Sequence, residues 1–163
     1  AGNVLLAQPN FSDIELLTVD KTSYYVAFGA YLASTAHVEL IPVDGNAPRG
    51  ILNRVAGWGF LKTEGAGQVA VSQAGSIFSM NVAPNMPVIV DVENVVAFEE
   101  GLEWNALLSG MISSVRKVKG RLGHSLWSGE ALAICFEGTG KVYVCSSKRI
   151  KSNGGAASDR GTF

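Results

Sequence analysis

Basic side chains gather in two short runs in the last third of the chain. The segments RKVKGR and KRIK hold seven of the thirteen basic residues, namely Arg116, Lys117, Lys119, Arg121, Lys148, Arg149 and Lys151. Runs of this kind bind the phosphates of nucleic acid or an acidic protein surface, although many are only solvated loops. Because no aromatic side chain stands between these charges to stack on bases, the sequence argues against RNA as the partner.

The two histidines would need catalytic partners that the sequence does not supply. His37 falls in an expected strand, whereas His124 falls in a Gly-rich loop far along the chain. Ser125 and Glu130 stand close to His124, but closeness along the chain is not the geometry of a catalytic triad. No Gly-x-Ser-x-Gly turn is present either. We therefore expect no nucleophilic catalysis.

Acidic and glycine-rich segments are similarly poor candidates for chemistry. Glu99 and Glu100 occupy successive positions of an expected strand, so their side chains point to opposite faces and do not flank one glycosidic bond. The segments EGAG (64–67) and EGTG (137–140) join two expected strands, whereas a phosphate-binding loop opens a helix. We interpret both as hairpin turns, and we expect no enzyme, no cofactor and no small-molecule substrate.

The two cysteines, Cys135 and Cys145, flank the second of these turns. A hairpin closed there would put Cys135 opposite Val142 and Cys145 opposite Leu132, on opposite faces of the sheet. We therefore expect no disulfide between them. Cys and His do not occur at zinc-binding spacing, so the sequence predicts no metal site and does not indicate a redox compartment.

Composition is that of a single globular domain. The chain has 163 residues and a net charge of -1, so it carries no overall field that would attract nucleic acid or anionic lipid. Hydrophobic residues make up 47% but come in short runs, far below the ~20 residues of a membrane-spanning helix. We expect no membrane insertion, one domain over residues 1–150, and a polar, Gly-rich tail over residues 151–163.

The elements that must position all these side chains come from an internal repeat. Three segments share a small residue, Gly, a polar residue and then alternating side chains that begin with Val: AGNVLLAQ (1–8), AGQVAVSQ (66–73) and TGKVYVCS (139–146). A second block, residues 25–40, matches residues 89–104 at an offset of 64. The matches divide the domain into units of about 1–65 and 66–147.

Apolar and polar side chains alternate with a period of two in both units. We expect strands at Gly67–Ser72, Ile77–Val82, Val88–Val92, Val95–Glu99, Ala131–Glu137 and Lys141–Cys145. Because one unit does not bury its apolar face alone, the predicted fold is all-β, a β-sandwich of two pseudo-symmetric repeats of short antiparallel strands. Its inner faces would include Val4, Leu6, Val69, Val71, Val142 and Val144. A helix candidate at Asn105–Arg116 is weakened by Gly110.

Three segments resemble the signature of the altered-inheritance-of-mitochondria, or mitochondrial biogenesis, family: GRLGHSLWSGEALAICFEGTGKVYVCS (120–146), VAGWGFLKTEGAGQVAVSQAGSI and VENVVAFEEGLEW. The resemblance covers about residues 1–147. It implies a β-sandwich similar to the tryptophan RNA-binding attenuator protein, in oligomeric assemblies, and a cytoplasmic location by analogy with prokaryotic relatives. The chain departs from the family at the turns GAG and GTG, where the family has Gly-Pro-Gly, and at Ala131.

The first residues of the chain motivate a hypothesis about assembly. Residues 1–8 correspond to the second arm of a hairpin whose first arm would precede Ala1, so the arm that holds Val4, Leu5 and Leu6 would expose a sheet edge. A neighbouring subunit could cover this edge by strand addition, and a contact that does not close would grow into a filament. We therefore expect a non-enzymatic structural or assembly protein that binds itself.

The alternative is a binding module that takes RNA or an acidic protein partner on the two basic runs. The sequence leaves two cellular locations for the protein. A leader cleaved before Ala1 would place the chain at the cell surface or outside the cell, instead of in the cytoplasm.

Overall fold

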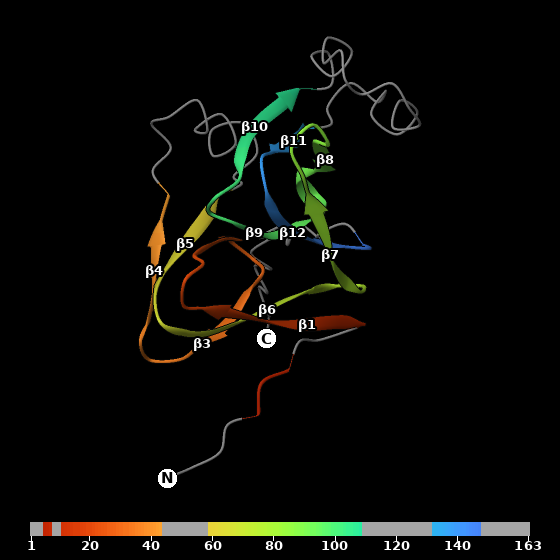
Figure 1. Cartoon of the computed structure of the whole chain (residues 1–163). Helices are drawn as coiled ribbons and strands as arrows, with labels where there is room; N and C mark the ends of the chain where they lie inside the picture. Colours follow the sequence, from red (N-terminus) through yellow and green to blue (C-terminus); the bar gives the residue numbers. More distant parts are fainter. Residues whose placement is uncertain (1–4, 8–10, 44–58, 109–131, 148–163) are drawn as a thin grey trace, which may run out of the picture.

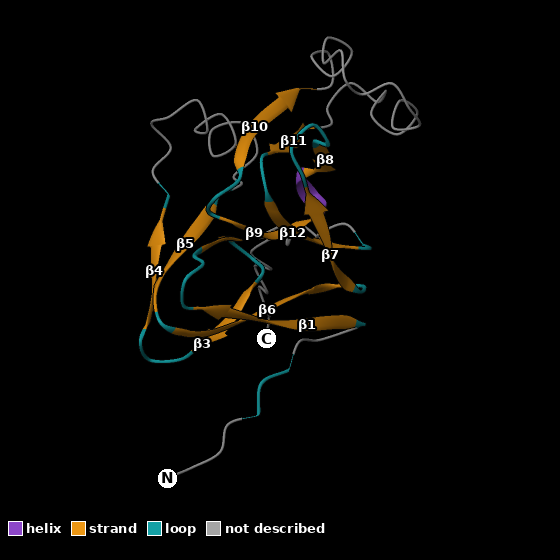
Figure 2. Cartoon of the chain, in the orientation of Figure 1, coloured by secondary structure: helices purple, strands orange, loops and turns teal. Residues whose placement is uncertain are grey.

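The computed structural model describes residues 5–7, 11–43, 59–108 and 132–147. This part of the chain is built from strands, with one short 3₁₀ turn, η1 (Val92–Asn94) (Figure 2). The strands are β1 (Ser12–Val19), β2 (Tyr24–Ala27), β3 (Tyr31–Ser34), β4 (Val38–Pro42), β5 (Phe60–Gly65), β6 (Gly67–Ala74), β7 (Ile77–Val82), β8 (Val88–Asp91), β9 (Val95–Glu99), β10 (Glu103–Leu108), β11 (Leu132–Glu137) and β12 (Gly140–Cys145).

The strands form three antiparallel sheets. A six-stranded sheet has the order β4-β5-β2-β9-β12-β7, and two three-stranded sheets have the orders β1-β6-β3 and β10-β11-β8. In Figure 1 the β1-β6-β3 sheet lies below β9 and β12, and the β10-β11-β8 sheet lies above them. Strand β9 is accordingly covered on both faces, since Val95, Val96, Ala97 and Phe98 are all 0% exposed.

Each half of the chain builds the same pair of three-stranded arrangements. Strands β1 to β6 form β1-β6-β3 and β4-β5-β2, while β7 to β12 form β7-β12-β9 and β10-β11-β8. The registers coincide as well, because Val26 lies opposite Leu61 in one unit and Val90 lies opposite Ile134 at the equivalent place in the other. Even the register shift in the β3–β6 ladder recurs between β9 and β12. The predicted all-β sandwich of two pseudo-symmetric repeats is confirmed, and strand pairing places the junction of the units between β6 and β7.

The segments EGAG and EGTG are not the hairpin turns that the sequence suggests. β5 pairs with β2 and β4, whereas β6 pairs with β1 and β3, so the two strands that flank EGAG belong to different sheets. β11 and β12, which flank EGTG, repeat this arrangement. Each segment is a corner at which the chain passes from one sheet to another. Gly65 (φ +99°) and Gly138 (φ +105°) occupy equivalent corner positions, where a residue with a Cβ is disfavoured.

We expect Gly65→Ala to destabilise the protein more than Gly138→Ala. Both substitutions put a Cβ at positive φ, which costs about 1–2 kcal/mol. At Gly65 the new Cβ would also collide with the backbone carbonyl oxygen of His37, whereas at Gly138 the nearest atom is 3.8 Å away. Urea unfolding of the two variants measures the difference. Equal losses of unfolding free energy would contradict the steric argument.

An aromatic cluster holds the β10-β11-β8 sheet against the six-stranded sheet. The ring centroid of Phe98 lies 4.9 Å from that of Phe136 and 5.4 Å from that of Trp104. On its own sheet Phe98 lies 5.0 Å from Tyr25 and 5.1 Å from Phe60. These tilted and edge-to-face arrangements are the ones that aromatic quadrupoles favour. Phe98 is therefore the centre of the packing between these two layers.

Two expectations about local structure are wrong. Residues 105–108 lie in strand β10 and not in a helix. The periodicity of such a short apolar run does not distinguish a helix from a strand, and here pairing with β11 makes the segment a strand. Leu6, expected on an inner face, is 47% exposed and belongs to no strand, because nothing in the described part pairs with residues 5–7. The other described members of the predicted inner faces are buried: Val69, Val71, Val142 and Val144. Val4 lies outside the described residues.

Candidate functional site

Exposed apolar side chains concentrate near the start of the described chain. Leu5 is 94% exposed, and Phe11, which precedes β1, is 97% exposed. Along β1, Ile14 and Leu16 lie on one face of the strand and are also exposed, while Leu17 on the other face is buried. β1 is an edge strand of its sheet. The apolar character that the sequence predicts for the start of the chain is therefore present at Leu5 and Leu6, but the continuous exposed strand is β1.

One strand pairing breaks the equivalence of the two units. Nine ladders join the strands of the described residues. Eight of them form four equivalent pairs, one member from each unit, whereas the ninth, between β2 and β9, joins the units. Its counterpart would join β8 to β3, because β8 corresponds to β2 and β3 corresponds to β9. Within the described ranges β8 pairs with β11 alone and β3 pairs with β6 alone.

The strands that lack the counterpart ladder, β3 and β8, are also less buried than their equivalents in the other unit. Val95 and Ala97 of β9 are 0% exposed, whereas Tyr31 and Ala33, at the equivalent positions of β3, are partly exposed. The residues of β8 are likewise less buried than those of β2, since only Val90 among them is buried, at 8% exposed, whereas Tyr24, Val26 and Ala27 of β2 are all buried. The β2–β9 ladder thus covers apolar strands that the units otherwise leave open. We call the open side of β3 and the open side of β8 the β3 edge and the β8 edge.

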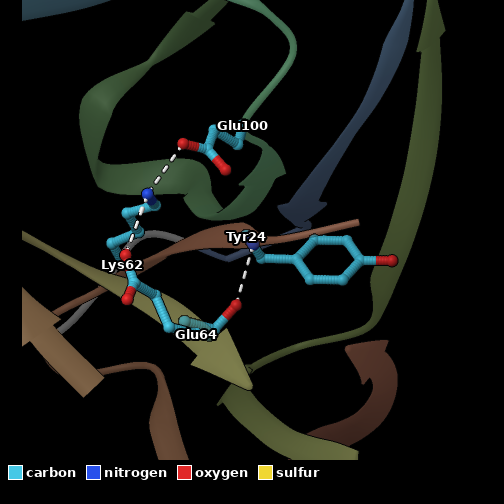
Figure 3. A network of polar contacts seen from close by, with 5 residues as sticks. Tyr24, Lys62, Glu64 and Glu100 are labelled. Carbon is cyan, nitrogen blue, oxygen red and sulfur yellow. Dashed lines mark hydrogen bonds and ion pairs between the residues drawn. The ribbon is translucent and has the colours of Figure 1, made fainter. Parts of the chain in front are cut away.

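A polar network ties β5 to the turn after β9 (Figure 3). The Nζ atom of Lys62 lies 3.0 Å from Oε1 of Glu64 and 2.8 Å from Oε1 of Glu100. These two carboxylates, Glu100 more than Glu64, raise the pKa of Lys62 above its usual value. Beside the network, the backbone N–H of Tyr24 donates a 2.8 Å hydrogen bond to Oγ1 of the buried Thr63. Lys62 is therefore held as a paired cation, which suits a structural role.

The neighbouring carboxylates border an open depression. It has a volume of about 360 Å³ and is lined by Lys21, Thr22, Ser23, Glu99, Glu100 and Gly101. Glu100 lies in the turn after β9 and not on the strand, so the expectation that it points away from Glu99 across a strand is wrong. Oε2 of Glu99 accepts a hydrogen bond from the backbone N–H of Lys141 at 3.1 Å. Both carboxylates thus bind groups of the chain itself.

Two tyrosines lie on the face of the six-stranded sheet opposite the aromatic cluster. The rings of Tyr24 and Tyr143 are 6.1 Å apart in an edge-to-face arrangement. Burial, with smaller contributions from Tyr24, Glu99 and Glu15, raises the pKa of Tyr143 to about 12. Burial likewise raises the pKa of Tyr24. Both phenols therefore stay protonated at neutral pH, where neither would act as a base.

No disulfide joins the two cysteines, as expected, and both side chains are buried. The register predicted around them is wrong. Cys135 lies opposite Asn105 and Ile89, and Cys145 lies opposite Ile77. Burial, and secondarily the charge of Glu137, raises the pKa of Cys135. A buried thiol with a raised pKa is a poor nucleophile.

The remaining sequence candidates do not come together in the described structure. His37 lies exposed in the turn between β3 and β4 and not in a strand. Outside the described residues lie His124 and both basic runs: Arg116, Lys117, Lys119, Arg121, Lys148, Arg149 and Lys151. Among the residues that the structure describes, no group of three His, Cys, Asp or Glu side chains could hold a metal ion. The same residues include no helix that is long and apolar enough to cross a membrane.

The β3 and β8 edges are the feature that sequence reasoning missed. The signal was present, because the match of residues 25–40 to 89–104 aligns β2 with β8 and β3 with β9. The match says which strands are equivalent but not which strands pair. The expected hairpins assigned each strand a local partner and so hid the open edges.

Comparison with known proteins supports the architecture. A crystal structure of protein SPYM3_0169 from Streptococcus pyogenes is similar to the chain with a TM-score of 0.62 and 23% sequence identity, over 83% of this chain and 55% of that protein. The chain thus spans about half the length of that relative, and the likeness concerns the fold. Curated protein sequences give no match. The model of the mitochondrial biogenesis family AIM24 matches residues 1–147, nine-tenths of the chain, and the chain therefore belongs to this family.

Proposed function

We propose that the chain is a non-enzymatic structural protein whose role is to assemble with copies of itself. The observation that carries the proposal is the exposed apolar face of the edge strand β1, where Ile14 and Leu16 are exposed a few residues after Phe11, which is 97% exposed. Natural proteins cover such strands or blunt them with charge, and apolar patches on a surface mark sites of interaction. Assembly between copies of the chain would cover this surface.

The polar groups of the described structure support a structural role. Lys62 is paired with two carboxylates, and Glu99 accepts a hydrogen bond from the backbone of a neighbouring strand. These side chains hold β5, β9 and β12 together and are already engaged. The alternative, a module for RNA or an acidic protein, depends on basic residues outside the described part, so no contact in the structure favours it.

Light scattering coupled to size-exclusion chromatography tests the proposal over a range of protein concentrations at low and high salt. We expect particles several times heavier than the 17.2 kDa chain, with a mass that rises with concentration. Apolar contacts persist in high salt, whereas contacts through the basic runs would weaken steeply. A stable monomer at micromolar concentration would refute the proposal. Dissociation by salt alone would favour the basic runs instead.

A further inference from the structure

We infer that the β8 edge of one copy pairs with the β3 edge of the next, so that copies join head to tail through a repeat of the chain's own β2–β9 ladder. The inference deepens the proposed function and rests on it, because it adds a second contact, between the β3 and β8 edges, to the exposed face of β1. Its partner is a second copy of this chain. Among the strands that the structure describes, the β2–β9 ladder alone has no counterpart.

The β2–β9 ladder shows that the two units recognise each other through these strands. It joins the edge strand of the β4-β5-β2 arrangement to the edge strand of the β7-β12-β9 arrangement. The same chain carries a second example of each arrangement, β10-β11-β8 and β1-β6-β3, with the same internal registers. The two edges that would meet by the same rule are those of β8 and β3.

These two edges do not meet within one copy. In Figure 1 the β10-β11-β8 sheet and the β1-β6-β3 sheet lie on opposite sides of β9 and β12. No ladder joins β8 to β3 among the strands of the described part. A β8–β3 counterpart of the β2–β9 ladder would therefore have to form between two molecules. A contact between two different surfaces of this kind closes into a ring or continues as a filament, according to its rotation.

The chemistry of the two edges permits pairing. β3 reads YLAS and β8 reads VIVD, and neither contains Lys, Arg or Pro, the residues that block edge pairing in natural sheets. The transferred register pairs Val88–Val90 with residues 33–35, all uncharged, and leaves Asp91 outside it, with its carboxylate accepting a hydrogen bond from the backbone N–H of Glu93. Ala33 corresponds to the fully buried Ala97, and Val90, already 8% exposed in the single chain, corresponds to the fully buried Val26. The contact would lack the Tyr25–Phe98 ring pair of the internal ladder, since Ile89 and Ser34 stand at the equivalent positions. We therefore expect a weaker, reversible joint.

The internal ladder also sets the register. Tyr24 lies opposite Glu99 and Val26 opposite Ala97. Transferred by the repeat, this places Val88 of one copy opposite Thr35 of the next, and Val90 opposite Ala33. Directly opposed residues of an antiparallel pair bring their Cβ atoms to about 4.5–5.5 Å, close to the separation that a disulfide requires. A cysteine pair at residues 35 and 88 can thus report the contact.

The test mixes two full-length variants, Thr35→Cys and Val88→Cys, under mild oxidation and follows covalent dimers on a non-reducing gel. Ile41 lies on β4, an edge strand of the six-stranded sheet, and is partly exposed, so Ile41→Cys mixed with Thr35→Cys is the control for random collision. We expect the 35–88 mixture to cross-link at least about tenfold faster, because a specific contact raises the effective thiol concentration. Light scattering of the unmodified chain runs in parallel.

The outcomes of the cross-linking and light-scattering experiments distinguish failure of the inference from failure of the proposed function. Fast 35–88 cross-linking supports the inference, and a chain that carries both substitutions should then give a ladder of covalent multimers. If the chain assembles but the 35–88 pair links no faster than the control, the inference fails while the proposed function stands. If the doubly substituted chain instead forms a disulfide at monomer mass, β3 and β8 meet within one copy and the inference fails. A chain that is monomeric throughout overturns both.

Discussion

Replacement of Phe98 by alanine is expected to reduce the free energy of unfolding by about 3–5 kcal/mol. Phe98 is 0% exposed and lies at the centre of a cluster of rings from four other strands: Tyr25 of β2, Phe60 of β5, Trp104 of β10 and Phe136 of β11. The substitution removes the central ring between the β10-β11-β8 sheet and the six-stranded sheet and leaves a cavity, although Tyr25 and Phe60 still contact Trp104. For a chain of this length the melting temperature should fall by roughly 6–20 °C. Urea and thermal unfolding followed by tryptophan fluorescence measure both quantities.

Phe78→Ala is the matched control for Phe98→Ala. Phe78 lies on β7 opposite Val144 and is 50% exposed, so its removal leaves no enclosed cavity and should cost less than about 1.5 kcal/mol. An equal loss in the two variants would mean that the aromatic cluster contributes no more than ordinary surface burial. It would also mean that the layers of the fold are held by other contacts.

Introduction of a charge at Ala33 is expected to weaken self-association by at least about a hundredfold, because a charge buried without a partner costs roughly 3–5 kcal/mol. Ala33 is partly exposed in the single chain, so lysine is tolerated there before assembly. Its equivalent in β9, Ala97, is fully buried by the β2–β9 ladder. Ala33→Lys should therefore leave the thermal stability of the monomer almost unchanged while analytical ultracentrifugation shows loss of the larger species.

Ser79→Lys provides the comparison for Ala33→Lys, since Ser79 is exposed on β7. This substitution adds the same charge on a strand that forms neither the β3 edge nor the β8 edge and should leave assembly intact. If both variants lower the mass of the assembly equally, the effect comes from net charge rather than from the β3 edge. If neither does, the β3 edge is not covered in the assembly.

Much of the strand content was predictable from local patterns. The expected strands Ile77–Val82 and Val95–Glu99 match β7 and β9 residue for residue. Period-two alternation and frequent turn residues identify such segments because both reflect the local backbone. The internal offset of 64 residues also identified β2 with β8 and β3 with β9 correctly. The repeat and the all-β class were therefore readable without tertiary information.

Strand pairing was not predictable in the same way. A glycine with positive φ suits a tight hairpin and a corner between sheets equally well, so EGAG and EGTG could be read as either. The choice between β5 pairing with β6 and β5 pairing with β2 depends on residues more than thirty positions away. The wrong choice misplaced the register of Cys135. Leu6 was assigned to the core for a separate reason, its match to Val71 in the repeat.

The candidate site depended on the same information. The first residues of the chain pointed to an open edge, but only the assembled sheets show that β1 is exposed and that β3 and β8 lack the ladder that β2 and β9 share. An edge is defined by the absence of a neighbour, which no local pattern records. The sequence by itself determined the repeat, the strand class and the apolar character of the strands. Only the tertiary structure decided which strands pair and which edges stay open, because both depend on contacts between residues distant along the chain.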